Sequence, residues 1–324
     1  MKRLLTGVLG VLVAVGVALP LSAEQGADGK VADIPIDHVG IVVRDIDAVA
    51  QAYADVFGVD VPAVQEEQNI TFPADFDGDR DASVKTALIP LNGVSVELLQ
   101  PVGGASPWRD HLDKYGEGMH HISYHGLADA HAAAAKAIEK GGKVVVGGPE
   151  ATTVMVDLRE QLGMTIGFSE LPANPTRQAP AEPAVFGDNV VSYTSVVVHD
   201  TNEAVALFGE ITGAAVPNVF EPQISYPEGY TGEWTGSPSL GMVALGGMGL
   251  AFTAPAGGSS PWQDSIDQQG ANLHHFGILV SGHQQQIDYL AGKGGSIVIG
   301  GGTMGYSWMD LTSSLKTLIE MNGQ

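Results

Sequence analysis

The fold of this chain is decided by a stretch that occurs twice, Ser106-Pro107-Trp108-Arg109-Asp110 and Ser260-Pro261-Trp262-Gln263-Asp264. At the same spacing in both copies a histidine pair follows, His120-His121 and His274-His275. Further along, Lys140-Gly141-Gly142 corresponds to Lys293-Gly294-Gly295. The chain therefore consists of two homologous halves.

Each half divides again into two similar units. The segment Ile36–Val43 is rich in β-branched residues, which favours a strand, and Asp45 then precedes a stretch with apolar residues at helical spacing. Asp200 and Glu203 form a capping-box pattern at the equivalent place in the second half. Each quarter of the chain thus predicts a strand, a helix and about three further strands. The predicted fold class is α+β, with four such modules and curved mixed sheets.

The two halves are separated by a segment that contains Pro172, Pro175, Pro180 and Pro183. Prolines at this density indicate an exposed connection. We therefore predict a first domain over residues 34–171, a linker over residues 172–189 and a second domain over residues 190–324.

The N-terminus predicts a secretory signal over residues 1–23. A short basic start, Met1-Lys2-Arg3, precedes an apolar run, and Ala23 is a small residue suited to cleavage. The alternative is a membrane anchor, but the apolar run is shorter than the roughly 20 residues that a membrane-spanning helix needs. The expected location is therefore periplasmic or secreted, with no membrane contact after cleavage.

Composition limits the partners and the chemistry of the chain. The formal net charge of −22 argues against nucleic acid and against anionic membrane surfaces, because both require a basic face. There is no cysteine, so a metal site must be built from histidine and carboxylate. We expect a small-molecule substrate. Because the duplication resembles a fused dimer, the chain is expected to be a monomer or a homodimer.

Side-chain alternation places two histidines and one carboxylate on the concave side of the predicted sheets. Successive residues of a strand face opposite sides, so His121 and His275 point away from the helices. By the same alternation His120 and His274 are expected to face the helices and to be packing residues. Glu97 lies between apolar neighbours and needs a partner, because an unpaired buried charge is costly. A metal ion is one such partner.

Three segments carry a resemblance to a known family: Ile36-Asp37-His38-Val39-Gly40-Ile41-Val42-Val43, Val96-Glu97-Leu98-Leu99-Gln100-Pro101 and Gly116-Glu117-Gly118-Met119-His120-His121-Ile122. They resemble the vicinal oxygen chelate superfamily, with its glyoxalases, bleomycin resistance proteins and extradiol dioxygenases. Within it they are most similar to methylmalonyl-CoA epimerases and glyoxalase I. The resemblance covers nearly all of residues 34–324. It implies two tandem domains, each of two βαβββ modules, and metal cups that are built from pairs of such modules.

The resemblance also implies one metal ligand from the first strand and one from the last strand of each module. At these positions modules one and four carry His38, Glu97, His275 and Glu320, whereas modules two and three carry His121, Gly167, Tyr193 and Ala251. If modules one and four share a cup, as in a fused glyoxalase I-type arrangement, one shell is complete and the other is almost stripped. We therefore predict a metal site of His38, Glu97, His275 and Glu320.

The rival arrangement pairs module one with module two. It places His121 beside His38 and Glu97 and lacks a fourth ligand, since Gly167 stands where glutamate is expected. A set of two histidines and one carboxylate with open positions suits Fe(II) oxygenases.

The donor atoms suit a divalent ion such as Zn, Ni, Co, Mn or Fe(II). Such an ion chelates adjacent oxygens and stabilises an enediolate after a carbon acid loses its proton. Glu320 is the first candidate for the base and Glu97 is the second. The expected function is an isomerase or lyase that acts on a small oxygen-rich substrate.

Two alternatives remain from the sequence, an extradiol-type ring-cleaving dioxygenase with Fe(II) and a non-catalytic small-molecule-binding protein of the bleomycin-resistance kind. An exported chain would not meet CoA thioesters or glutathione adducts, which are cytosolic. A small oxygen-rich acid, a sugar derivative or a catechol-like compound fits an exported protein better.

Overall fold

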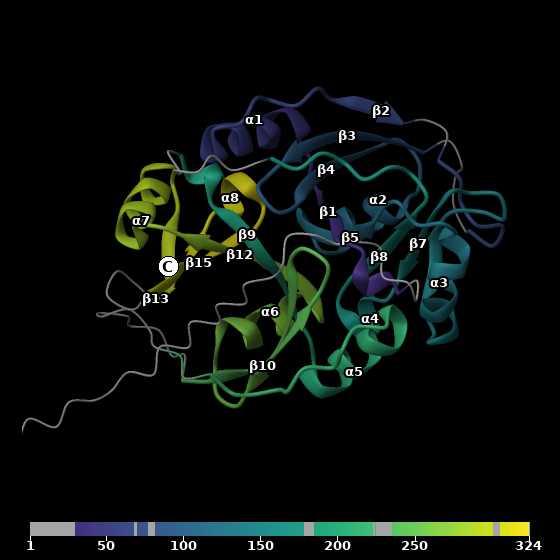
Figure 1. The fold of residues 1–324 in the computed structure, drawn as a ribbon. Coiled ribbons are helices and arrows are strands. Elements are labelled where there is room, and N and C mark those ends of the chain that lie inside the picture. The colour runs from purple at the N-terminus through teal and green to yellow at the C-terminus, as the bar shows by residue number, and fades with distance from the viewer. Residues whose placement is uncertain are drawn as a thin grey trace, which may run out of the picture.

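The computed structural model describes residues 30–67, 70–76, 82–177, 185–222, 224, 235–300 and 305–323. Over these residues it has an α+β fold with two curved mixed sheets, one of eight strands and one of seven (Figure 1). This confirms the predicted fold class. The predicted signal segment, residues 1–23, lies outside the described residues.

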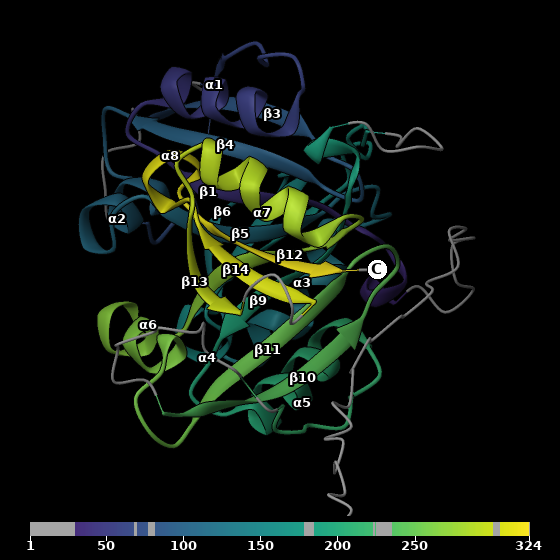
Figure 2. The same cartoon turned by 90° about the vertical axis from the view of Figure 1, so that its left-hand side faces the viewer.

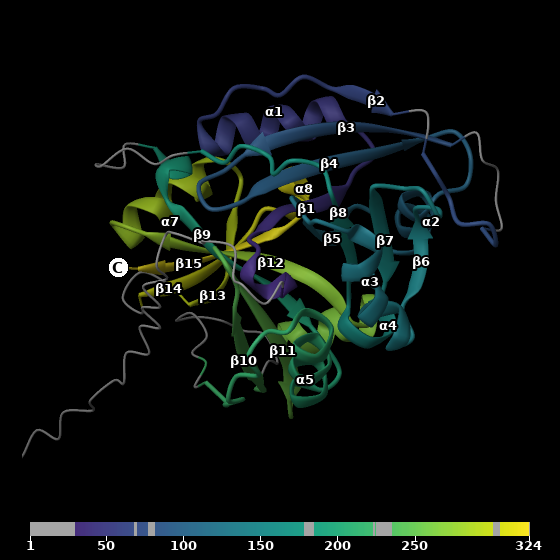
Figure 3. The same ribbon diagram turned by 45° about the vertical axis from the view of Figure 1, so that its right-hand side comes forward.

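The first half of the chain forms the first sheet, whose strand order is β2-β3-β4-β1-β5-β8-β7-β6. The strands are β1 (Ile36–Val42), β2 (Gln65–Glu67), β3 (Ser83–Pro90), β4 (Ser95–Val102), β5 (Gly118–Tyr124), β6 (Lys143–Val146), β7 (Thr153–Asp157) and β8 (Thr165–Ser169). At the centre, β1 runs parallel to β4 and antiparallel to β5 (Figure 3).

The second half forms the second sheet in the corresponding order, β10-β11-β9-β12-β15-β14-β13. Its strands are β9 (Val190–Val197), β10 (Ser237–Ala244), β11 (Gly249–Ala256), β12 (Asn272–Val280), β13 (Ser296–Gly300), β14 (Tyr306–Asp310) and β15 (Leu318–Gly323). Here β9 takes the place of β1, because it runs parallel to β11 and antiparallel to β12.

Long helices cover one face of each sheet. Helix α1 (Ile46–Phe57) packs on β3 and β4, and α3 (Ala130–Glu139) packs on β7 and β8. Helices α5 (Thr201–Thr212) and α7 (His283–Gly292) do the same for the second sheet. The predicted cap residues start α1 and α5, since the carboxylates of Asp45 and Asp200 accept backbone N–H groups three residues on. Within the described residues, no helix has the length and apolar character needed to cross a membrane.

The repeated Ser-Pro-Trp motif starts a helix in each half. Ser106 and Ser260 cap α2 (Pro107–Lys114) and α6 (Pro261–Gln269), and proline occupies the first turn of both. The tryptophans Trp108 and Trp262 are buried, one in each half. Four short helices complete the set in the described residues, the α-helices α4 (Arg159–Leu162) and α8 (Thr312–Leu315) and the 3-10 helices η1 (Val31–Asp33) and η2 (Phe186–Asp188). The motif is thus structural.

The prediction that modules one and four share a cup is wrong. The first strands of modules one and two, β1 and β5, are hydrogen-bonded neighbours, so each sheet is built from modules that are adjacent in the chain. Modules one and four do meet, but through helices outside the sheets (Figure 2). There Tyr53 of α1 donates its hydroxyl to the carbonyl oxygen of Leu315 at 3.1 Å, and Tyr289 of α7 donates to that of Val56 at 2.9 Å.

We expect both helix caps to contribute similarly to stability. Replacing Ser106 or Ser260 by alanine removes a side-chain oxygen that accepts the N–H of Arg109 or Gln263, both at 3.1 Å. Each substitution should lower the free energy of unfolding by about 1 kcal/mol. Chemical denaturation of the two single variants and the double variant measures this. Unchanged unfolding midpoints would contradict the capping role.

Candidate metal centre

Three side chains from the central strands of the first sheet meet on its concave face. They are His38 on β1, Glu97 on β4 and His121 on β5. The Nε2 atom of His38 lies 3.3 Å from Nε2 of His121 and 3.3 Å from Oε2 of Glu97. Nε2 of His121 lies 3.7 Å from the same carboxylate oxygen. Both histidines are buried, and the Glu97 side chain is 22% exposed.

The close approach of the His121 ring to His38 depends on Gly40. In the strand register Gly40 is the partner of both Glu97 and His121. A Cβ atom at Gly40 would lie 1.9 Å from Cε1 of His121. The glycine therefore leaves the space in which the His121 ring lies across β1, towards His38.

The donor set fits a divalent metal ion. Ligand atoms at about 2.0–2.2 Å from one ion are themselves roughly 3 to 3.7 Å apart, which is the spacing of these three atoms. Two imidazoles and one carboxylate leave further coordination positions open for substrate or water. The Nδ1 atom of His38 lies 2.8 Å from the carboxylate of Asp37, so the Nε2 atom of His38 is left to face the ion.

The pKa values of the three side chains indicate that a positive charge is favoured between them. Burial by itself would lower the pKa of His38, but Glu97 and Asp37 on either side raise it to about 9. Burial would raise the pKa of Glu97, but the two histidines hold it well below its ordinary value. Burial keeps the pKa of His121 below its ordinary value despite the neighbouring Glu97. A proton on His38 therefore occupies the place that a metal ion would take.

The second sheet carries a different arrangement at the equivalent positions. The strand register confirms the repeat alignment: Gly277 opposes Tyr193 and Glu320, as Ser123 opposes His38 and Gly167. Nε2 of His275 lies 3.1 Å from Oε2 of Glu320. In the first sheet Gly40 makes room for the His121 ring, and in the second Gly277 makes room for the Tyr193 ring.

Hydrogen-bond donors surround Glu320. Besides His275, the carboxylate accepts hydrogen bonds from Tyr193, Trp308 and, at 3.3 Å, from Asn322. Burial raises the pKa of Glu320, but these donors bring it below its ordinary value. Among the described residues, no group of three metal-type ligands forms in this sheet. The donors satisfy the buried charge that a metal would otherwise neutralise.

The predicted shell of His38, Glu97, His275 and Glu320 does not form. Its members divide into two pairs, one in each sheet, because modules pair with their neighbours in the chain. The rival ligand His121 joins His38 and Glu97 instead. The physical reason is the β1–β5 ladder, in which Val39 opposes Ile122 and Gly40 opposes His121.

The prediction that the histidines before the two ligand positions are packing residues is confirmed for His120, which is buried against His111 of α2, but the strand alternation on which it rested is interrupted at both histidines. The register between β1 and β5 shifts at His120, and that between β9 and β12 shifts at His274, so each histidine is the extra residue of a β-bulge. A bulge interrupts the alternation of side chains. As a result Nδ1 of His120 lies 3.1 Å from Nδ1 of His121, and Nδ1 of His274 lies 2.9 Å from Nδ1 of His275. The pair was visible in the sequence, but the bulge was not.

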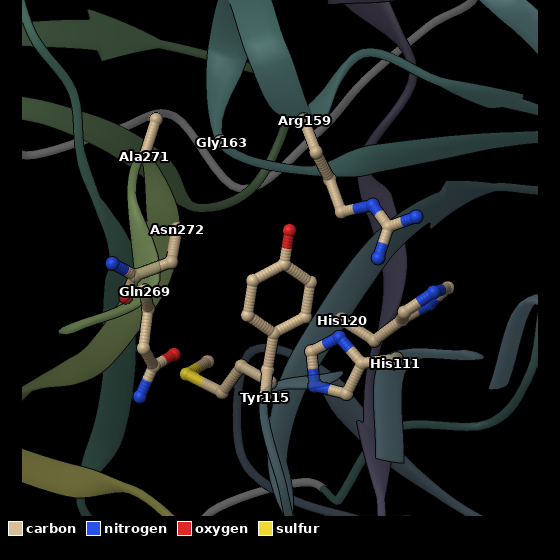
Figure 4. A pocket seen from close by; sticks show the side chains of 9 residues that line it. His111, Tyr115, His120, Arg159, Gly163, Gln269, Ala271 and Asn272 are labelled. Atoms are coloured by element: carbon tan, nitrogen blue, oxygen red, sulfur yellow. The ribbon is translucent and has the colours of Figure 1, made fainter. Parts of the chain in front are cut away.

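His120 also contributes to a small pocket between the two halves (Figure 4). The pocket has a volume of about 10 Å³, which suits a single water molecule. Its lining residues are His111, Tyr115, Met119, His120, Arg159, Gly163, Gln269, Ala271 and Asn272. Nδ1 of His111 and Nε2 of His120 are buried without a hydrogen-bond partner. Burial lowers the pKa of both histidines, so both are neutral at physiological pH.

Sequence reasoning did not identify the residues that support the ligands. Asp37 was read only as part of a strand motif, yet it is buried and contacts His38, His125 and Asn174. The adjacent Asp37-His38 pair was the one available signal. Asn174 could not be found from the sequence, because it lies in the predicted linker, far from His38 along the chain.

Metal binding should depend on the first sheet alone. We expect the wild-type protein to bind one divalent ion per chain and His121→Ala to lose it, because the substitution removes one of three ligands. His275→Ala should retain the ion. Elemental analysis after dialysis against metal-containing buffer measures the bound metal. Loss of metal only in His275→Ala would restore the pairing of modules one and four.

The affinity for metal should rise with pH. His38 keeps its proton up to a pH of about 9, and a metal needs the neutral imidazole. Below that pKa the proton competes with the ion, so affinity should fall about tenfold for each pH unit between 8 and 6. Competition titrations with a chromophoric chelator give the dissociation constants. An affinity that stays constant over this range would contradict the proton on His38.

The chain is similar to known proteins of one superfamily. Residues 37–156 match the family described as the glyoxalase/bleomycin resistance protein/dioxygenase superfamily. An ethylmalonyl-CoA/methylmalonyl-CoA epimerase of Cereibacter sphaeroides is 33% identical over 114 residues, which cover 35% of this chain and 75% of the relative. An uncharacterized Bacillus subtilis protein, YqjC, is 28% identical over 89 residues, which cover 28% of this chain and 55% of that protein.

Among solved structures, a variant of 4-hydroxymandelate synthase from Streptomyces coelicolor has a TM-score of 0.62. The match covers 90% of this chain and 92% of the synthase, at 12% sequence identity. A likeness at this identity concerns the fold alone, and it extends over both halves of the chain.

Proposed function

Because this chain belongs to the glyoxalase/bleomycin resistance protein/dioxygenase superfamily, we propose that its first half is a metal-dependent enzyme centred on His38, Glu97 and His121. The observation that carries the proposal is the convergence of three ligand atoms, backed by Asp37, on the concave face of the sheet. The second half, where Glu320 is satisfied by hydrogen bonds, is proposed as a structural partner without a metal.

The reaction proposed is proton transfer at a carbon next to a carbonyl group, as in an isomerase or a lyase. The similarity of the chain to an epimerase, over 114 residues, supports this reaction type. A bound divalent ion supplies Lewis-acid polarisation of the substrate oxygens. Glu97 and the two histidines would hold the ion, and we propose a separate residue as the base.

Glu67 is the proposed base. Its side chain is exposed, but partial desolvation and the nearby charge of Glu97 raise its pKa, which makes its carboxylate a better proton acceptor than an ordinary glutamate. It lies at the end of β2, opposite Val84 of β3. Glu320, the first candidate from the sequence, belongs to the other sheet, and Glu97 is proposed as a metal ligand. Neither of them is retained as the base.

The substrate proposed is a small oxygen-rich acid or a comparable carbonyl compound, which the protein would meet outside the cytosol. This proposal rests on the predicted signal over residues 1–23 and on the net charge of −22. The named substrate of the epimerase relative is a CoA thioester, and this chain offers few basic residues for such a phosphate-rich ligand, with 15 Lys and Arg against 37 Asp and Glu.

A second candidate is an Fe(II) dioxygenase. The observation that favours it is Gly167, which stands where a fourth protein ligand is expected and leaves a two-histidine, one-carboxylate set. Oxygen uptake with a catechol and Fe(II), abolished in His38→Ala, would support this candidate over the isomerase.

Exchange of substrate hydrogen tests the proposed reaction. The metal-loaded protein is incubated in D₂O with a panel of small 2-oxo and 2-hydroxy acids, and deuterium incorporation is followed by NMR. Glu67→Gln should slow exchange by roughly 10²–10⁴-fold, because it removes the base, while metal content stays the same. Glu66→Gln, one residue away on β2, is the matched control. Equal exchange rates in wild type and Glu67→Gln would exclude Glu67 as the base.

A further inference from the structure

We propose that residues 172–177, the first part of the segment joining the two halves, belong to the metal centre. In this view Asn174 is a positioning residue that orients the ligand His38 through Asp37. We call residues 172–177 the linker clamp. The inference deepens the proposed function and rests on it, because it concerns the same His38, Glu97 and His121 centre.

The carboxylate of Asp37 is held from two sides. Its Oδ1 atom accepts the backbone N–H of Asn174 at 2.6 Å, and its Oδ2 atom accepts the side-chain amide of Asn174 at 2.7 Å. Oδ2 also lies 2.8 Å from Nδ1 of His38. The Asp37 side chain is only 2% exposed. A carboxylate this deeply buried needs such donors, and hydrogen bonds to a charged acceptor are the strong ones.

This arrangement determines which nitrogen of His38 is available. Because Asp37 accepts from Nδ1, the hydrogen of the neutral imidazole is on Nδ1 and the lone pair is on Nε2. Nε2 is the atom that faces Glu97 and His121. Without Asn174, the remaining contacts of Asp37 are His38 and, at 3.5 Å, His125. The carboxylate would then be free to rotate, and the His38 ring would lose its fixed direction.

The rest of the linker clamp is attached to the same end of the sheet. The carbonyl oxygen of Pro172 lies 3.3 Å from Nδ1 of His125, which follows β5. Ser95, the first residue of β4, donates its hydroxyl to the carbonyl oxygen of Pro175 at 3.1 Å. The N–H of Arg177 donates to the carbonyl oxygen of Leu91 at 3.0 Å. The clamp thus contacts the ends of all three strands that carry the ligands.

The second half has a different residue at the position that corresponds to Asp37. Tyr193 corresponds to His38, so Ser192 corresponds to Asp37. The hydroxyl of Ser192 donates to the carbonyl oxygen of Gly277 at 3.1 Å, within its own sheet. The aspartate and its clamp therefore occur together with the candidate metal ligands.

Asp37, His38 and His125 also lie close enough to form a second group of metal-type ligands. The hydrogen bonds favour a clamp over a second ion at this point. Both oxygens of Asp37 already accept donors, and Nδ1 of His125 is directed at the Pro172 carbonyl.

A double-mutant cycle tests the positioning role, with Co²⁺ as the probe and its visible absorption as the signal. Asn174→Ala should weaken Co²⁺ binding about tenfold, and Asp37→Asn should weaken it by about 10- to 100-fold. If Asn174 acts through Asp37, adding Asn174→Ala to Asp37→Asn should change the affinity less than about twofold. A general disturbance of the linker would instead weaken binding by the same factor in both backgrounds.

Asn218→Ala, an exposed asparagine of the second half, is the matched control and should bind Co²⁺ like wild type. If Asn174→Ala does not fold, Asn174→Ser keeps the backbone donor and a shorter side-chain donor and should show a smaller loss. Wild-type affinity in both Asn174 variants would overturn the proposal. So would an undiminished effect in the Asp37→Asn background.

Backbone amide hydrogen exchange of the metal-free full chain tests the linker clamp independently of metal binding. The backbone amide of Asn174 should be protected in wild type and should exchange faster in Asp37→Ala, because its acceptor is removed. If wild type binds no Co²⁺ while this difference is present, the metal function fails and the clamp stands. If the Asn174 amide exchanges equally fast in both proteins, the clamp fails regardless of the metal result.

Discussion

The antiparallel pairing of β1 with β5 is the interaction on which the rest of the first half depends. It joins two modules into one sheet and places His121 beside β1, the strand that carries His38. On its other side β1 pairs with β4, the strand that carries Glu97. Backbone hydrogen bonds set this register, and alternation then directs the three side chains to the same face. Gly40 completes the arrangement, because any larger residue at this position would collide with the His121 ring.

The two halves have the same strand arrangement, but they stabilise the charge of a glutamate in different ways. Each concave face holds a partly buried glutamate, Glu97 or Glu320, and a charge withdrawn from water requires a partner. In the first half the partners are two histidines arranged as a metal would need them. In the second half a tyrosine replaces one histidine, and the carboxylate accepts hydrogen bonds from Tyr193 and its neighbours. Three of the four aligned positions differ between the halves: His38 corresponds to Tyr193, Glu97 to Ala251 and Gly167 to Glu320.

Much of the fold was predictable because it follows from local rules. The duplicated motif, the cap at Asp45 and the β-branched residues of β1 each depend on residues that are close in the chain. The candidate site was predictable only in part. His38, Glu97 and His121 were all recognised as metal-friendly, but counting the lost ligands favoured the wrong partner module. The bulges at His120 and His274 were missed because a bulge depends on how the opposing strand is paired, which a single sequence does not reveal.

The sequence by itself determined the number of modules, their α+β character and the residues able to bind a metal, since repeats, periodicity and side-chain chemistry are local properties. Only the tertiary structure decided which of these residues meet, because strand pairing brings together positions that are far apart in the chain. It also decided that Asn174 of the linker holds Asp37, through hydrogen bonds for which composition and spacing provide no signal. The same ligand residues, paired differently, would have formed a different site.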